Sequence, residues 1–214
     1  MSLRIFLSIL LSSLLLMSAP GRAAESAMTL QNPTILVLGD SLSAGYGLDA
    51  DQGWVHLLKQ KLRTGDFPHT VINASISGET TAGGLARLPS LLDRHQPQLV
   101  LVELGGNDGL RALPVPQIRQ NLERIVDLSA DGGATAVLFE MRIPENYGPT
   151  YTEAFTRTFT QVSEARGVPL VPFLLAAFAT DPAAFQSDGI HPSAAAQAQI
   201  LDTVWPALEP LLNR

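Results

Sequence analysis

The segment ILVLGDSLSAGYG, residues 35–47, decides how the rest of the chain is interpreted. An apolar run ends at Gly39 and gives way at once to Asp40 and Ser41. Such a run is typical of a buried strand that ends at the edge of a sheet. A serine just beyond a strand is most often the N-cap of a helix, but the position would also suit a nucleophile at the rim of the sheet.

Apolar runs alternate with amphipathic segments along the chain, and this alternation predicts an α/β fold. The runs lack a clean two-residue alternation, as expected for strands that are covered on both faces. We therefore predict a three-layer α/β/α arrangement around a five-stranded parallel sheet. Pro89 indicates a late start or a bend in its helix, and Pro206 indicates a break or kink in the last helix. The predicted strands are residues 34–39, 70–75, 98–105, 135–141 and 168–173, and the predicted helices are residues 54–64, 85–95, 115–130, 150–167 and 193–212.

Residues 1–23 have the layout of a secretory signal peptide. Arg4 precedes an apolar run of 13 residues from Ile5 to Met17, and small residues at Gly21 and Ala23 follow it. The run is short for a membrane-spanning helix. We expect cleavage after Ala23 and a periplasmic or secreted single domain, residues 24–214, without a stable membrane anchor. An uncleaved anchor is the alternative.

Composition excludes several classes of function. The net charge is −6, and it becomes −8 once Arg4 and Arg22 leave with the signal, which argues against nucleic acid or an anionic membrane surface as a partner. The chain has no cysteine, which excludes disulfides, a thiol nucleophile and a cysteine-based metal site. Asp40 is interpreted as a bracing turn residue and Asp108 as a cap of the segment that follows it. No further His or carboxylate cluster accompanies them, so we predict no metal site.

Small polar turns follow the predicted strands, and together they supply the groups that acyl transfer needs. The hydroxyl of Ser41 needs a base, which His191 can provide, and Asp188 can orient the imidazole from three residues earlier. The oxyanion of a tetrahedral intermediate needs preorganised donors. The backbone N–H groups of Ser41 and Gly78 and the side-chain amide of Asn107 can supply them.

Four motifs resemble the signature blocks of the SGNH (GDSL) hydrolases, in that family's order: GDSL at 39–42, Gly78 within SISGET, GGND at 105–108 and DGIHP at 188–192. Each falls at a predicted strand end or before the last helix, which favours catalysis over ordinary helix-starting turns. INASISGET and VLVELGGNDGLR resemble the family's periplasmic multifunctional thioesterase, lysophospholipase and arylesterase branch. The resemblance implies a flavodoxin-like sheet order 2-1-3-4-5. It also implies a nucleophile at Ser41, acid and base at Asp188 and His191, and an oxyanion hole at Ser41, Gly78 and Asn107.

The segment RIPENYGPTY, residues 142–151, is long for an irregular connection between a strand and a helix. It is either an ordinary connection or a loop that faces the substrate. In the branch that the chain resembles, this loop lies over the acyl groove. The side chains that we expect to bind substrate are mostly apolar: Leu42, Leu110, Ile143, Pro144, Tyr147 and Ile190.

We therefore predict a serine hydrolase of carboxylic esters and acyl thioesters, including acyl-CoA, aryl esters and lysophospholipids, which acts through an acyl-enzyme on Ser41. The resemblance implies medium to long acyl chains. The chemistry needs no cofactor, the expected partner is the small-molecule substrate, and we expect a monomer. Two alternatives stay open: an SGNH carbohydrate acetylesterase, and a non-enzymatic exported lipid-binding protein.

Overall fold

Five parallel strands form one sheet in the computed structural model, which describes residues 32–212. The strands are β1 (Thr34–Gly39), β2 (Thr70–Asn73), β3 (Leu99–Glu103), β4 (Thr135–Phe139) and β5 (Leu170–Val171). Their order is β2-β1-β3-β4-β5 and all neighbouring pairs are parallel, which confirms the expected sheet. The predicted signal peptide lies outside the described residues.

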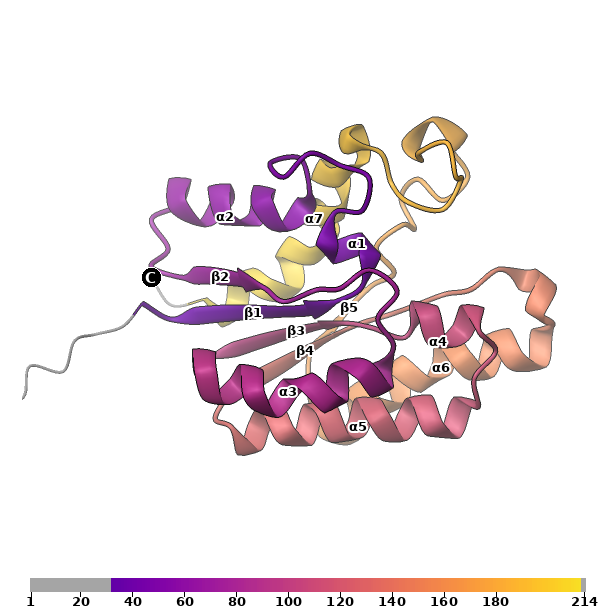
Figure 1. The fold of residues 1–214 in the computed structure, drawn as a ribbon, viewed down its shortest axis with the longest axis horizontal. Helices are drawn as coiled ribbons and strands as arrows, with labels where there is room; N and C mark the ends of the chain where they lie inside the picture. Colours follow the sequence, from indigo (N-terminus) through magenta and orange to yellow (C-terminus); the bar gives the residue numbers. More distant parts are fainter. Residues whose placement is uncertain (1–31, 213–214) are drawn as a thin grey trace, which may run out of the picture. The chain divides into compact units, whose positions relative to one another are not determined.

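Helices cover both faces of the sheet, so the three-layer prediction is confirmed (Figure 1). Their bounds are α1 (Ser41–Ala44), α2 (Trp54–Thr64), α3 (Thr81–His95), α4 (Gly106–Leu110), α5 (Val115–Asp131), α6 (Pro149–Arg166) and α7 (Gln197–Leu208), with 3₁₀ turns η1 (Glu145–Tyr147), η2 (Pro182–Ala184), η3 (Ala194–Ala196) and η4 (Glu209–Leu211). α2 and α7 pack together on one face, and α3, α5 and α6 cover the other. The short helices α1 and α4 follow β1 and β3 directly.

The central strands β1 and β3 are mostly apolar because both faces of the sheet are buried there. All of β3 is buried, as is β1 after its first residue. Trp54 at the start of α2 is fully buried against the sheet. Gly39 of β1 pairs with Glu103 of β3, so these two strands end side by side. Loops beyond the carboxyl ends of parallel strands are where open α/β sheets bind ligands.

Helix α3 begins at Thr81 rather than at residue 85, so the interpretation of Pro89 as a late start is wrong. Thr80 caps the helix by accepting a hydrogen bond from Gly83 N (3.2 Å). Asp108 Oδ2 accepts another hydrogen bond from Thr81 N (2.8 Å). Asp108 therefore holds the start of α3, and the prediction that it caps the segment following it is wrong. These contacts satisfy amide groups at the helix start.

Other predicted boundaries are also wrong. The strands predicted at residues 70–75, 98–105, 135–141 and 168–173 are each longer than the observed β2, β3, β4 and β5. The connection after β4 contains η1, and α6 begins at Pro149, so the irregular part of residues 142–151 is shorter than predicted. The last predicted helix, residues 193–212, is divided into η3, α7 and η4. Pro206 does not break α7, which continues to Leu208.

Candidate active site

Three side chains from opposite ends of the described chain form a continuous hydrogen-bonded series. Ser41 Oγ lies 2.9 Å from His191 Nε2, and His191 Nδ1 lies 2.6 Å from Asp188 Oδ2. The other carboxylate oxygen, Asp188 Oδ1, accepts hydrogen bonds from the backbone N–H groups of Ile190 (2.9 Å) and His191 (3.0 Å). One short turn therefore carries both the carboxylate and the imidazole. The arrangement can move a proton from the hydroxyl to the imidazole and stabilise the cation that forms.

Ser41 is the first residue of α1 but not its N-cap. Asp40 takes that position, because its Oδ1 accepts a hydrogen bond from Leu42 N (3.0 Å). The helix ends after one turn at Gly45, whose left-handed backbone (φ 74°) favours glycine. The interpretation of Ser41 as a helix cap is therefore wrong, and its hydroxyl is instead bonded to His191.

Hydrogen bonds and a ring contact hold the loop that carries Asp188 and His191. The pKa of Asp188 is lowered to about 2. The largest cause is the hydrogen bond from the His191 side chain, and the backbone N–H groups of His191 and Ile190 contribute less. The rings of Tyr46 and His191 lie 4.4 Å apart, so Tyr46 covers part of the imidazole. Gln186 Nε2 donates to the carbonyl oxygen of Tyr46 (2.7 Å), which ties this loop to the segment after α1.

The predicted oxyanion-hole residues lie in α1, in α4 and in the loop after β2, and hydrogen bonds join these segments. Asn107 Nδ2 donates to Asp40 Oδ2 (3.0 Å), and because a carboxylate only accepts, this contact fixes which end of the Asn107 amide faces Asp40. One N–H of that amide is left for another acceptor. Gly78 has φ +80°, a conformation that favours glycine. Its carbonyl oxygen accepts a hydrogen bond from Arg111 Nη2 (3.0 Å) at the end of α4.

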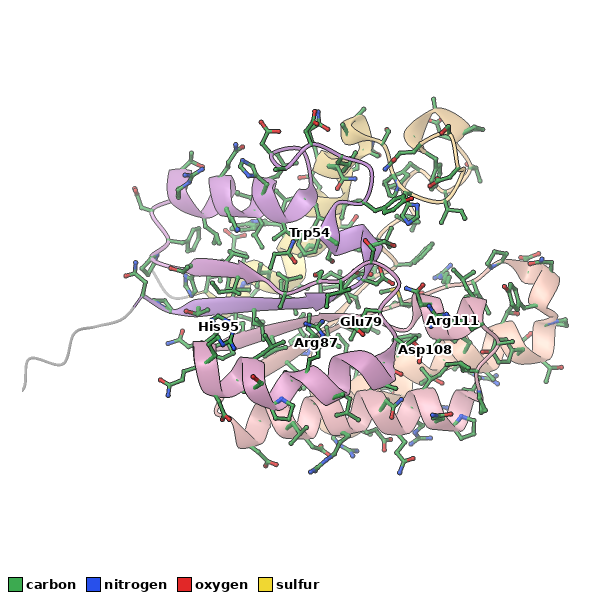
Figure 2. All side chains as sticks on the ribbon, viewed as in Figure 1. Trp54, Glu79, Arg87, His95, Asp108 and Arg111 are labelled. Carbon is green, nitrogen blue, oxygen red and sulfur yellow. The ribbon has the colours of Figure 1, made fainter. Side chains whose placement is uncertain are left out.

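A half-buried ion pair supports the loop that contains Gly78. Arg87 Nε donates to Glu79 Oε2 (2.8 Å), and Arg87 Nη2 donates to the carbonyl oxygen of Ala74 (3.0 Å). Figure 2 shows Glu79 and Arg111 near the end of the sheet toward which the strand arrows point, whereas His95 lies at the opposite end. The loop is therefore held from α3 on one side and from α4 on the other.

Glu103 is a buried residue of the site for which the sequence motifs predicted no role. Its Oε2 accepts hydrogen bonds from Ser43 Oγ (2.6 Å) and Asp40 N (3.2 Å), and its Oε1 has no partner among the described residues. Burial raises the pKa of Glu103 well above its usual range, and burial raises the pKa of Asp40 to about 6. In the sequence, the feature that could have indicated a role for Glu103 is its position as the one carboxylate within the apolar run QLVLVELG, residues 98–105.

The predicted substrate-binding residues differ in their surroundings. Leu110, Pro144 and Ile190 are exposed, Leu42 and Tyr147 are half-buried, and Ile143 belongs to the core. Tyr147 Oη donates to the carbonyl oxygen of Leu110 (2.7 Å), which joins η1 to α4. Tyr147 also lines a surface groove of about 560 Å³ that the other five predicted residues do not line; its lining residues are Ala112, Pro114, Val115, Pro116, Tyr147, Gly148, Pro149, Thr150, Tyr151 and Ala154.

Within residues 32–212, no group of three or more His, Cys, Asp or Glu side chains is arranged to hold a metal ion. No helix in this same part of the chain has both the length and the apolar character needed to cross a membrane.

The sheet order and the four motif loops at its carboxyl edge define a hydrolase of the SGNH class. The model of the GDSL-like lipase/acylhydrolase family matches residues 37–199, and the chain belongs to this family. The resemblance seen in the sequence is thereby confirmed.

Individual relatives carry names that agree with this class. The chain is 49% identical to Esterase TesA of Pseudomonas aeruginosa, over 84% of this chain and 89% of that protein. It is 46% identical to Thioesterase 1/protease 1/lysophospholipase L1 of Escherichia coli (strain K12), over 84% of this chain and 85% of that protein. Among solved structures, the psychrotrophic esterase EstA from Pseudoalteromonas sp., inhibited by monoethylphosphonate, has a TM-score of 0.80 at 44% identity and covers 83% of this chain and 97% of its own.

Proposed function

We propose that this protein hydrolyses carboxylic esters and acyl thioesters through an acyl-enzyme on Ser41. The observation that carries the proposal is the hydrogen-bonded series from Ser41 Oγ through His191 to Asp188. Relatives named esterase and thioesterase/lysophospholipase support both kinds of leaving group. A thiolate leaves with little need for protonation, so one site can serve esters and thioesters.

In the acylation step, Ser41 Oγ attacks the acyl carbonyl carbon while its proton moves to His191 Nε2. Asp188 stabilises the imidazolium, because its ionised carboxylate accepts a hydrogen bond from His191 Nδ1–H without taking the proton. The carbonyl oxygen becomes an oxyanion, which the N–H groups of Ser41 and Gly78 and the free N–H of Asn107 stabilise. The tetrahedral intermediate then collapses, the bond to the leaving oxygen or sulfur breaks, and His191 returns the proton to the leaving group.

In the deacylation step, water takes the place of the Ser41 hydroxyl. His191 accepts one proton from the water, whose oxygen attacks the ester carbonyl of the acyl-enzyme. The same donors stabilise the second oxyanion, and the proton on His191 returns to Ser41 Oγ as the fatty acid leaves.

Exposed apolar side chains around the site support an acyl chain as the substrate group. The large apolar residues that are most exposed in the described chain are Tyr46, Ile76, Leu110 and Ile190. Each lies close in sequence to a proposed functional residue: Ser41, Gly78, Asn107 and His191, respectively. Exposed apolar surface near a site favours an apolar ligand. We propose that Leu42, Ile143, Pro144 and Tyr147 complete this acyl-binding surface, with residues 142–151 facing the substrate.

Hydrolysis of nitrophenyl esters and acyl-CoA thioesters from acetyl to palmitoyl, by the wild type and Ser41→Ala, tests the proposal. We expect turnover to rise with chain length and to be lost in Ser41→Ala, while circular dichroism shows an unchanged fold. Substantial turnover by Ser41→Ala would exclude Ser41 as nucleophile. Activity limited to acetyl esters would favour a carbohydrate acetylesterase, and no turnover together with a copurifying fatty acid would favour a lipid-binding protein.

We also propose that the protein is exported and acts as a monomer in the periplasm or outside the cell. The positively charged start, the apolar run of residues 5–17 and the small residues before Ala24 support this location.

A further inference from the structure

We propose that Glu103 is a positioning residue, which holds the nucleophile and the Asn107 amide in place from beneath the active site. The inference rests on the proposed roles of Ser41 and Asn107. Glu103 touches neither reacting group, so its effect must pass through Asp40 and Ser43.

A single oxygen of Glu103 binds the residues on both sides of Ser41. Oε2 accepts hydrogen bonds from Asp40 N (3.2 Å), which precedes the nucleophile, and from Ser43 Oγ (2.6 Å), which follows it by two positions. Glu103 is the last residue of β3, which pairs with β1 along its length. The carboxyl therefore attaches the first turn of α1 to the central strand of the sheet.

Asp40 carries this constraint to the oxyanion donors. Its Oδ1 accepts from Leu42 N (3.0 Å) and its Oδ2 accepts from Asn107 Nδ2 (3.0 Å). A shift of the Asp40 backbone would therefore move the Asn107 amide as well as the turn that bears Ser41. A misplacement of about 1 Å in reacting groups can reduce turnover about 100-fold.

The glycine of the GDSL motif is explained by the space that Glu103 needs. A Cβ on Gly39 would lie 2.7 Å from Glu103 Oε2 and 2.8 Å from Ser43 Oγ, well inside normal contact distance. Gly39 is not among the glycines with positive φ, so its backbone conformation does not require glycine. Close approach of the Glu103–Ser43 pair does require it.

Burial disfavours the charged form of the Glu103 carboxyl. Burial, and then the charge of Asp40, raises the pKa of Glu103 well above its usual range. Within residues 32–212 no ion pair is formed by either Glu103 or Asp40. Glu103 Oε1 is buried without a partner among the described residues, which costs stability. Departures of this kind from an apolar core are expected where a site needs the polar group.

Steady-state kinetics of Glu103→Leu and Glu103→Gln test the inference, with the melting temperature measured for each variant. Glu103→Leu removes the acceptor for Asp40 N and Ser43 Oγ, so kcat should fall about 10- to 100-fold with KM changed by less than about twofold. Glu103→Gln keeps a neutral carbonyl oxygen in the same place and should retain kcat within about threefold. Wild-type kcat in Glu103→Leu, or an equal loss in both variants, would overturn the inference.

A pair of serine variants covers the case in which Glu103→Leu does not fold. Ser43→Ala removes one of the two donors to Glu103 and should lower kcat at unchanged KM. Ser129→Ala is the matched control, because its buried hydroxyl donates to the carbonyl oxygen of Ile125 (2.8 Å) within α5, and it should lower the melting temperature without changing kcat. Equal kcat values in the two serine variants would overturn the inference.

The same assay separates this inference from the proposed function on which it rests. An active wild type and an inactive Ser41→Ala leave the proposed function intact, whatever the Glu103 variants do. Retained activity in Ser41→Ala would instead overturn the proposed function itself.

Discussion

At Asp40, one carboxylate caps helix α1 with one oxygen and fixes the Asn107 amide with the other. The free N–H of Asn107 is then available to an oxyanion, so its contribution should be to the transition state rather than to substrate binding. We expect Asn107→Ala to lower kcat about 100- to 1,000-fold with little change in KM.

A matched asparagine controls for this substitution. Asn121 of α5 donates to Thr81 Oγ1 (3.0 Å), a contact that involves none of the proposed catalytic residues, and Asn121→Ala should leave kcat unchanged. A rise in KM at constant kcat in Asn107→Ala would contradict the oxyanion role.

Because the pKa of Asp40 is raised, we expect the unfolding free energy to depend on pH. Burial raises this pKa from 3.8 to about 6, against opposing contributions from Leu42, Asn107, His191 and Glu103. The folded state therefore binds a proton more tightly than the unfolded state, so the stability contributed by this group is full below about pH 4 and is lost as pH rises through 6. As pH falls from 7 to 4, the unfolding free energy of the wild type should therefore rise by about 1–3 kcal/mol relative to that of Asp40→Asn. Urea unfolding at several pH values measures it, and a constant difference would contradict the assignment.

Asp188 supplies the contrast, because its pKa is lowered from 3.8 to about 2. Its contribution to stability is present above about pH 4 and is lost as pH falls through 2. The difference in unfolding free energy between wild type and Asp188→Asn should therefore stay nearly constant from pH 7 to pH 4.

At the scale of elements, the side chains of Glu103 from β3 and Ser43 from α1 fill the space at the end of β1 and exclude a side chain at residue 39. Gly39→Ala should destabilise the fold by about 1–3 kcal/mol, because its Cβ would meet Glu103 and Ser43. Urea unfolding measures the loss. Gly53→Ala is the control, since a Cβ there would find only an ordinary contact at 3.7 Å, and its loss should be smaller. Adding Glu103→Ala to Gly39→Ala should recover part of the stability, and strictly additive losses would contradict a clash between these two residues.

Elements could be predicted where the signal is local. The bounds of β1 and α2 follow from apolar runs and helical spacing, and both agree with the structure at Thr34–Gly39 and Trp54–Thr64. The start of α3 could not be predicted, because part of its capping comes from Asp108, in the loop after another strand. The sheet order also lies beyond the alternation of strands and helices, and it was expected only from the resemblance to a known family.

The same distinction holds for the candidate site. The motifs carry Ser41, Asp188 and His191, and the structure brings these three into hydrogen-bond contact. The surroundings of Glu103 were not predictable, because its contacts with Asp40 and Ser43 depend on the pairing of Gly39 with Glu103 across two strands.

At the scale of the whole molecule, we expect an exported, acidic monomer. Cleavage after Ala23 would give a mature protein that begins at Ala24 and carries a net charge of −8, since Arg4 and Arg22 are removed from a chain of charge −6. Mass spectrometry of the exported protein should find Ala24 as its first residue, and light scattering should find a single chain. A membrane-bound form that still begins at Met1 would contradict the signal-peptide proposal.

The central claim is that an acyl-enzyme forms on Ser41, and covalent labelling with a nitrophenyl phosphonate tests it most directly. The phosphonyl group stays bound to the oxygen that attacks it, so peptide mass spectrometry can identify that oxygen. The account predicts one phosphonyl group per chain on the peptide that contains Ser41, loss of esterase activity in step with labelling, and no label on Ser41→Ala. Labelling of a different residue in step with inactivation, or an active enzyme that is never labelled, would contradict it.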